Sequence, residues 1–243
     1  MKNLTFLILA IFSSLLLTHA QEPYYFSNDT SHFIKVDGED IRAYLAKNLS
    51  YPISVAKSKR IGTMIGCVRV TPNAELVDVF VVNSVASSLD AIFISTLKHA
   101  FKKRQTSVNE LRDTTDFFIQ VKYTLGKERG DPYDFHVEPN KGIYNLSKEI
   151  ILVLYIPVAG WLMSDEEVFT PINSLYQAGN YKKCIHYLDE LIRRNPFNED
   201  IVFMRANAYA RLGKMKEAKA DYNYLRYFLR SAKHERLDTL FDM

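Results

Sequence analysis

The fold of this chain is decided by residues 62–82, which read GTMIGCVRVTPNAELVDVFVV. Met64, Val68 and Val70 alternate onto one face of a strand, with the small Gly66 between them. A turn follows at residues 71–74, because proline fixes φ and asparagine tolerates unusual backbone angles. Residues 76–82 are rich in valine, which is typical of a strand. The stretch therefore predicts a β-hairpin.

A helix is predicted on each side of the hairpin. Apolar residues recur at helical spacing from Asp40 to Leu49 and again from Leu89 to Phe101. Residues 116–125 then alternate between apolar and polar side chains, which predicts a third strand. The order helix, strand, strand, helix, strand predicts an α+β fold, in which a three-stranded antiparallel sheet carries helices on one face.

This ordered pattern resembles the C-terminal domain of TonB over residues 41–126. The residues that carry the resemblance are Tyr51-Pro52, Ile61-Gly62, Thr71-Pro72, Ser84 and Leu89-Asp90. The chain departs from the family at Asn73-Ala74, where the family usually has Asp-Gly, and at Phe101, where it often has tryptophan.

The resemblance implies that the last strand binds an extended segment of a partner at its free edge. The partner-binding residues at this edge would be Asp116, Phe117, Phe118, Ile119, Gln120, Val121, Lys122 and Tyr123. The alternative is that this strand is simply core, with its edge blunted by Lys122 or covered by the second domain.

The C-terminal part contains an internal repeat. Equivalent residues lie 34 positions apart, and the pairs are Gly179 and Gly213, Cys184 and Ala218, Leu188 and Tyr222, and Leu191 and Leu225. This period and these small residues resemble tetratricopeptide repeats over residues 168–228, with two helical hairpins. Arg205, Asn207 and Arg211 are predicted to line a groove that binds a second partner, although a charged helix face is more often solvated. The residues after 227 are available to cap the repeats.

The N-terminus has the layout of a secretory signal peptide. Lys2 precedes an apolar run from Leu4 to Leu17, and Ala20 offers a cleavage position before Gln21. The run is shorter than the roughly 20 residues that a spanning helix needs. We therefore expect cleavage and a periplasmic protein, with a retained membrane anchor as the alternative.

The expected organisation has five parts. They are a signal peptide (1–20), a lead-in (21–37), the TonB-like domain (38–126), a connecting segment (127–164) and the repeat module (165–243). The apolar residues 150–163 of the connecting segment are expected to form a buried strand or helix, and a membrane-surface contact through Tyr155 and Trp161 is left open. Whether Cys67 and Cys184 form a disulfide is also left open.

No pattern of catalytic or metal-binding residues stands out. The histidines are scattered, and the sequence contains no nucleophile elbow, phosphate loop or zinc motif. The net charge of +3 gives no argument for nucleic acid. We therefore predict no catalytic residue, metal or cofactor, no nucleic-acid partner and no enzymatic activity.

The sequence thus favours an exported envelope protein that binds outer-membrane or periplasmic proteins through a strand edge and through repeat helices. Two alternatives stay open at this point. One is a membrane-anchored TonB-type energy transducer for outer-membrane transport, although the chain has only 8 prolines and no proline-rich spacer. The other is an enzyme whose site is assembled from residues far apart in the sequence.

Overall fold

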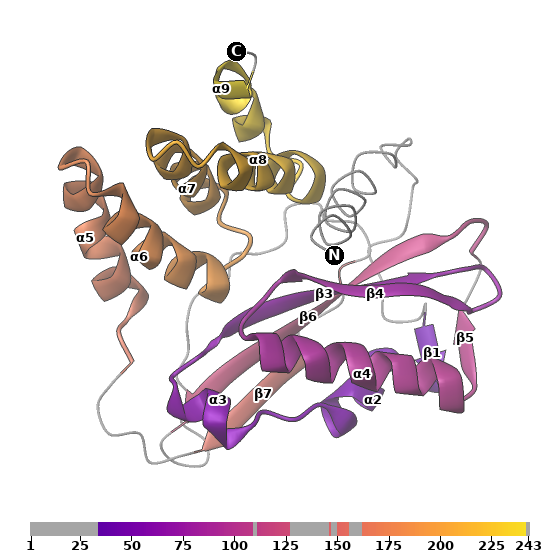
Figure 1. The fold of residues 1–243 in the computed structure, drawn as a ribbon. Coiled ribbons are helices and arrows are strands. Elements are labelled where there is room, and N and C mark those ends of the chain that lie inside the picture. Colours follow the sequence, from indigo (N-terminus) through magenta and orange to yellow (C-terminus); the bar gives the residue numbers. More distant parts are fainter. Residues whose placement is uncertain (1–33, 109–110, 127–145, 147–149, 156–161, 242–243) are drawn as a thin grey trace, which may run out of the picture.

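The structure is a computed structural model that describes residues 34–108, 111–126, 146, 150–155 and 162–241. The predicted signal peptide and Trp161 lie outside these residues. Figure 1 shows a sheet with a long helix across one side and a group of helices on the other. In the described part of the chain, no helix is both long and apolar enough to cross a membrane.

The main sheet has the strand order β4-β3-β6-β7. The strands are β3 (Gly62–Val70), β4 (Leu76–Asn83), β6 (Thr115–Gly126) and β7 (Ile150–Tyr155). Strand β3 pairs antiparallel with both β4 and β6, which confirms the three predicted strands and their antiparallel pairing. The segment expected to join the two domains supplies β7, which pairs with β6 in parallel.

A second, three-stranded sheet that the sequence did not predict lies beside the main one. Its order is β2-β1-β5, and its strands are β1 (Ile34–Val36), β2 (Glu39–Asp40) and β5 (Thr106–Val108). Each strand has only two or three residues, too few for an alternating pattern to be recognised.

Helices cover one face of the main sheet, as predicted. These helices are α2 (Ile41–Asn48), α3 (Ile53–Lys57) and α4 (Ser87–Lys103). Leu89, Phe93 and Leu97 of α4 are buried in the same core cluster as Met64 and Val68 of β3. A Cβ atom at position 66 would overlap the ring of Phe93, so the glycine there lets the helix approach the sheet.

The opposite face of the sheet packs against the C-terminal helices. These are α5 (Asp165–Gln177), α6 (Tyr181–Arg194), α7 (Glu199–Arg211) and α8 (Met215–Asn223), followed by a π-helical turn (Tyr224–Phe228), η3 (Ala232–Leu237) and α9 (Asp238–Phe241). Ile65 of β3 belongs to their core, and the rings of Phe118 and Phe228 meet edge-on at 5.3 Å. Gln120 and Lys122 of β6 are also buried. Strand β6 is therefore buried on both faces.

The prediction that Asp116–Tyr123 form a free sheet edge is wrong. Strand β6 pairs with β3 over Thr115–Tyr123 on one side and with β7 over Val121–Gly126 on the other, and Phe118 bridges to Leu146. The apolar run that begins at Ile150 finds its backbone partners on β6, so β6 lies inside the sheet. The alternative interpretation, that this strand is core, describes the structure.

Candidate protein-binding site

The helical module, defined here as residues 165–237, repeats one helical hairpin. The first unit is α5 with α6 and the second is α7 with α8. The helices α5 and α7 begin after Ser164 and Asn198, which are 34 residues apart and each accept a backbone amide at 3.1 Å. Both hairpins turn at a glycine with φ +71°, Gly179 and Gly213. The two predicted hairpins are therefore present, in the same register.

The buried side chains of the two units correspond as predicted. Cys184 and its equivalent Ala218 are fully buried, which shows the expected small residue where helices pack closely. Leu188 and Leu191 correspond to Tyr222 and Leu225, and all four belong to one core cluster.

A second repeated set lies on one face of the first helix in each unit. Glu166, Phe169 and Asn173 form what we call the α5 stripe, and Asp200, Phe203 and Asn207 form the α7 stripe. Each stripe has the spacing i, i+3, i+7, which places its three side chains on one helix face. Sequence reasoning missed the stripes, although extending the 34-residue comparison to the first helices finds them.

The chain's own C-terminal segment contacts two residues of the α7 stripe, Asp200 and Phe203. The ammonium of Lys233 forms an ion pair with Asp200, and the guanidinium of Arg236 lies 4.7 Å from the centroid of the Phe203 ring. Just before η3, the hydroxyl of Ser231 donates to the carboxylate of Glu199 at 2.8 Å. The segment therefore binds α7 by one ion pair, one hydrogen bond and one cation–π contact.

The α5 stripe is exposed along its whole length. Phe169 is 42% exposed, and Glu166 and Asn173 are exposed beside it. Glu166 has no ion-pair partner among the described residues, whereas its neighbour Asp165 pairs with Arg194 at 2.8 Å. Glu167 is also engaged, because its side chain accepts the Ser164 amide of the capping box at 2.6 Å. The α5 stripe thus places an acid that has no ion-pair partner in the described part of the chain beside an exposed aromatic ring.

The predicted groove residues do not form one surface. Arg205 donates to Asp221 at 2.6 and 2.9 Å and to Asp189 at 2.7 Å, so it ties together α6, α7 and α8. Burial opposes the charge of Arg205, but the bonds to Asp221 and the charge of Asp189 raise its pKa overall. Asn207 donates to the Phe203 carbonyl at 2.9 Å, and Arg211 is exposed. Arg205 is therefore held inside the module, while Asn207 belongs to the α7 stripe.

The cysteines are free and buried. Burial raises the pKa of the thiol in both Cys67 and Cys184, and a thiol with a raised pKa is a poor nucleophile. Within the described ranges, no group of three or more His, Cys, Asp or Glu residues is placed to hold a metal ion.

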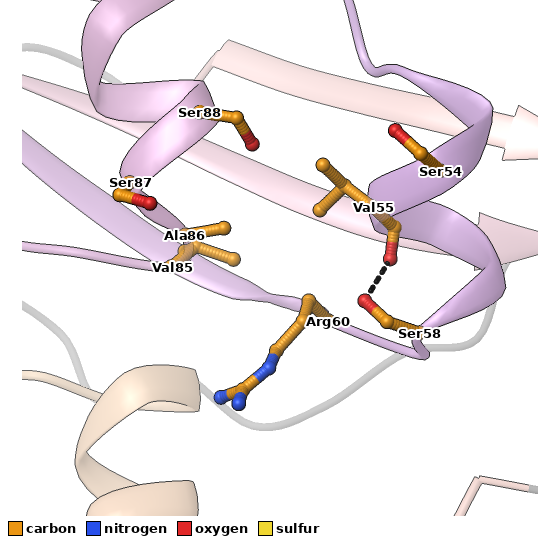
Figure 2. A pocket seen from close by; sticks show the side chains of 8 residues that line it. All are labelled: Ser54, Val55, Ser58, Arg60, Val85, Ala86, Ser87 and Ser88. Carbon is orange, nitrogen blue, oxygen red and sulfur yellow. Dashed lines mark hydrogen bonds between the residues drawn. The ribbon is translucent and has the colours of Figure 1, made fainter.

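An open hollow of about 470 Å³ lies between α3 and the beginning of α4 (Figure 2). It is lined by Ser54, Val55, Ser58, Arg60, Val85, Ala86, Ser87 and Ser88. Ser58 donates to the Val55 carbonyl at 2.6 Å, and Figure 2 shows the guanidinium of Arg60 pointing away from the serines. The polar groups of this hollow do not converge on one point, so the α5 stripe is the better candidate site.

Comparison with known families supports a helical interaction module and corrects the resemblance to TonB. Residues 167–235 match the bacterial transcriptional activator domain, a helical domain of the tetratricopeptide kind, and the TonB domain gives no match. The match covers less than a third of the chain. No curated protein and no solved structure matches the chain. Because the matched family is named for transcriptional activators, the absence of a nucleic-acid partner stays a prediction.

Proposed function

We propose that this chain is a non-catalytic protein-binding protein, and that its helical module holds a protein partner on the α5 stripe. The observation that carries the proposal is the 42% exposure of Phe169 between Glu166 and Asn173, on a module similar to a helical interaction domain. Aromatic side chains are enriched at the centres of protein interfaces, where polar groups surround them.

The α5 stripe supplies three kinds of contact. The ring of Phe169 offers apolar area, the carboxylate of Glu166 offers a charge, and the amide of Asn173 can both donate and accept hydrogen bonds. The equivalent residues Asp200 and Phe203 on α7 already hold a segment of this chain. This contact supports the proposal, because it is made by the same residue types in the same helical register.

The proposal includes export from the cytoplasm. Its support is the sequence alone, in which Lys2, the apolar residues 4–17 and Ala20 have the layout of a cleavable signal peptide. Mass spectrometry of the mature protein from the native envelope should find Gln21 at the N-terminus. A mature chain that still contains residues 1–20 would contradict this part.

The binding site is tested by co-purification of the tagged full chain from its native cells. Replacing Phe169→Ala should lower recovery of the partner at least about tenfold, since a central aromatic residue typically contributes 2 kcal/mol or more to binding. The matched control is Leu212→Ala, because Leu212 is 40% exposed and lies between α7 and α8, outside the α5 stripe. Equal recovery with both variants would contradict the proposal.

A further inference from the structure

The contacts that the α7 stripe makes with the C-terminal segment show which chemistry the exposed α5 stripe is suited to bind. This inference rests on the proposed function, and it concerns the class of partner. Lys233 and Arg236 lie three positions apart on η3, and they meet Asp200 and Phe203, which lie three positions apart on α7. Side chains at i and i+3 of a 3₁₀ helix lie directly above one another. The two basic side chains of η3 therefore contact one acidic and one aromatic side chain of α7.

The numbering also gives the direction of the bound segment. Lys233 meets the earlier residue of the α7 pair and Arg236 meets the later one, so η3 runs along α7 in the same direction. Leu237 follows Arg236 and is fully buried. The segment that the α7 stripe binds is therefore a short helical segment with two basic residues three positions apart, followed by an apolar residue.

The α5 stripe presents the same pair at the same place in its helix. Glu166 and Phe169 are the second and fifth residues of α5, as Asp200 and Phe203 are of α7. The first turn of α5 also contains Asp165 and Glu167, so the whole turn is acidic. Interfaces pair opposite charges, and an acidic surface selects a basic partner.

We propose that the α5 stripe binds a short helical segment of a partner protein that carries Lys or Arg at two positions three residues apart. The first basic side chain pairs with Glu166, and the second stacks on Phe169. The C-terminal segment of a second copy is a poorer occupant, because Ser231 and Leu237 are buried in their own chain.

The test uses a fluorescently labelled peptide with the sequence LRSAKHERLDTLF, residues 229–241 of this chain, as the probe. Its matched control peptide carries Lys233→Ala and Arg236→Ala. Anisotropy is measured with the full chain, with Glu166→Gln combined with Phe169→Ala, and with the control variant Leu212→Ala. We expect the dissociation constant to rise at least about tenfold when either the two basic residues or the two stripe residues are removed, and to rise with salt.

Binding that is unchanged in the Glu166, Phe169 double variant would place the peptide elsewhere and overturn the inference. Equal binding of the alanine peptide would overturn it as well. Self-association of the chain that is lost in the double variant, measured by sedimentation, would assign a second copy as the occupant instead of a separate partner. If the peptide does not bind but Phe169→Ala still lowers recovery of the co-purified protein, only the proposed class of partner is wrong. If Phe169→Ala leaves recovery of the co-purified protein unchanged, the proposed function is wrong.

Discussion

The two units of the helical module share one design but differ in what contacts their first helix. In the second unit, Lys233 pairs with Asp200 and Arg236 lies over Phe203, whereas the equivalent residues Glu166 and Phe169 have no such contact in the described part of the chain. Their glycine turns correspond, and so do several buried residues, among them Cys184 with Ala218 and Leu188 with Tyr222. We infer that the 34-residue repeat determines the buried core of the module. The C-terminal segment, which contacts the second unit, determines which helix surface is available to a partner.

The two units are also held in place by different contacts. In the second unit Arg205 joins three helices, and the equivalent residue of the first unit is Pro171. The first unit is attached to the sheet through α6, where Arg193 donates to the Ile61 carbonyl. Burial and the neighbouring charges of Arg60 and Arg194 together lower the pKa of Arg193 to about 10. The first unit is thus attached to the sheet through α6, and Arg205 ties the second unit to the same helix through Asp189.

The largest effect should come from breaking the attachment of the first unit. Gly62 has φ +153°, and a Cβ atom there would overlap the carbonyl of Arg193. We expect Gly62→Ala to lower the unfolding free energy by about 3 kcal/mol, since both the backbone angle and the contact with α6 are lost. Urea unfolding of the full chain measures this change.

The control for this prediction is Gly38→Ala. Gly38 has φ +80°, but an added Cβ would have nothing within 4 Å. Its replacement should cost only about 1 kcal/mol, which is the backbone term alone. Equal costs for the two variants would show that the approach of α6 to Gly62 contributes nothing.

Local patterns predicted the parts of the fold that depend on one strand or one helix. The hairpin from Gly62 to Asn83 and the helix α4 were found because alternation and helical spacing are visible within a short window. Strand β7 was left undecided between strand and helix, because a short apolar run has no period that separates the two. Its pairing with β6 depends on residues far away in the sequence, and that pairing removed the predicted binding edge.

The site was predictable only in part, for the same reason. The 34-residue period located the two hairpins and their glycine turns. It could not show that Asp189 and Asp221, from other helices, converge on Arg205, so a structural arginine was predicted to line a groove. The α5 stripe is exposed because no segment among the described residues packs over it. A pattern within a short window of sequence cannot predict whether a distant segment packs there.

The next largest effect should come from opening the ionic network of the second unit. Replacing Arg205→Ala leaves the carboxylate of Asp221, which is 5% exposed, without its partner. Removing one partner of a buried pair costs 3–5 kcal/mol, and because Arg205 is itself partly exposed we expect about 2 kcal/mol. Thermal and urea unfolding measure the change. The control Arg211→Ala, at an exposed position of the same helix, should stay within about 0.5 kcal/mol.

The first unit should gain stability when the proline inside α5 is removed. Pro171 lies inside α5, where it cannot donate an amide to the preceding turn. We expect Pro171→Ala to raise the unfolding free energy by about 1 kcal/mol, which is less than the full helix penalty of proline because the unfolded chain becomes more flexible. Urea unfolding measures the gain, and a loss of stability would show that α5 needs the proline for its packing.

The smallest effect concerns the contact between Arg236 and Phe203. Phe203→Leu should cost about 0.5 kcal/mol less in an Arg236→Ala background than in the natural chain, because Arg236 lies over the ring at 203. The coupling is measurable as a double-mutant cycle, in which the packing of the Phe203 ring on the helical core cancels, and Phe169→Leu with Arg236→Ala is the control pair. Equal costs of Phe203→Leu with and without Arg236 would show that the contact between the two side chains contributes no binding energy of its own.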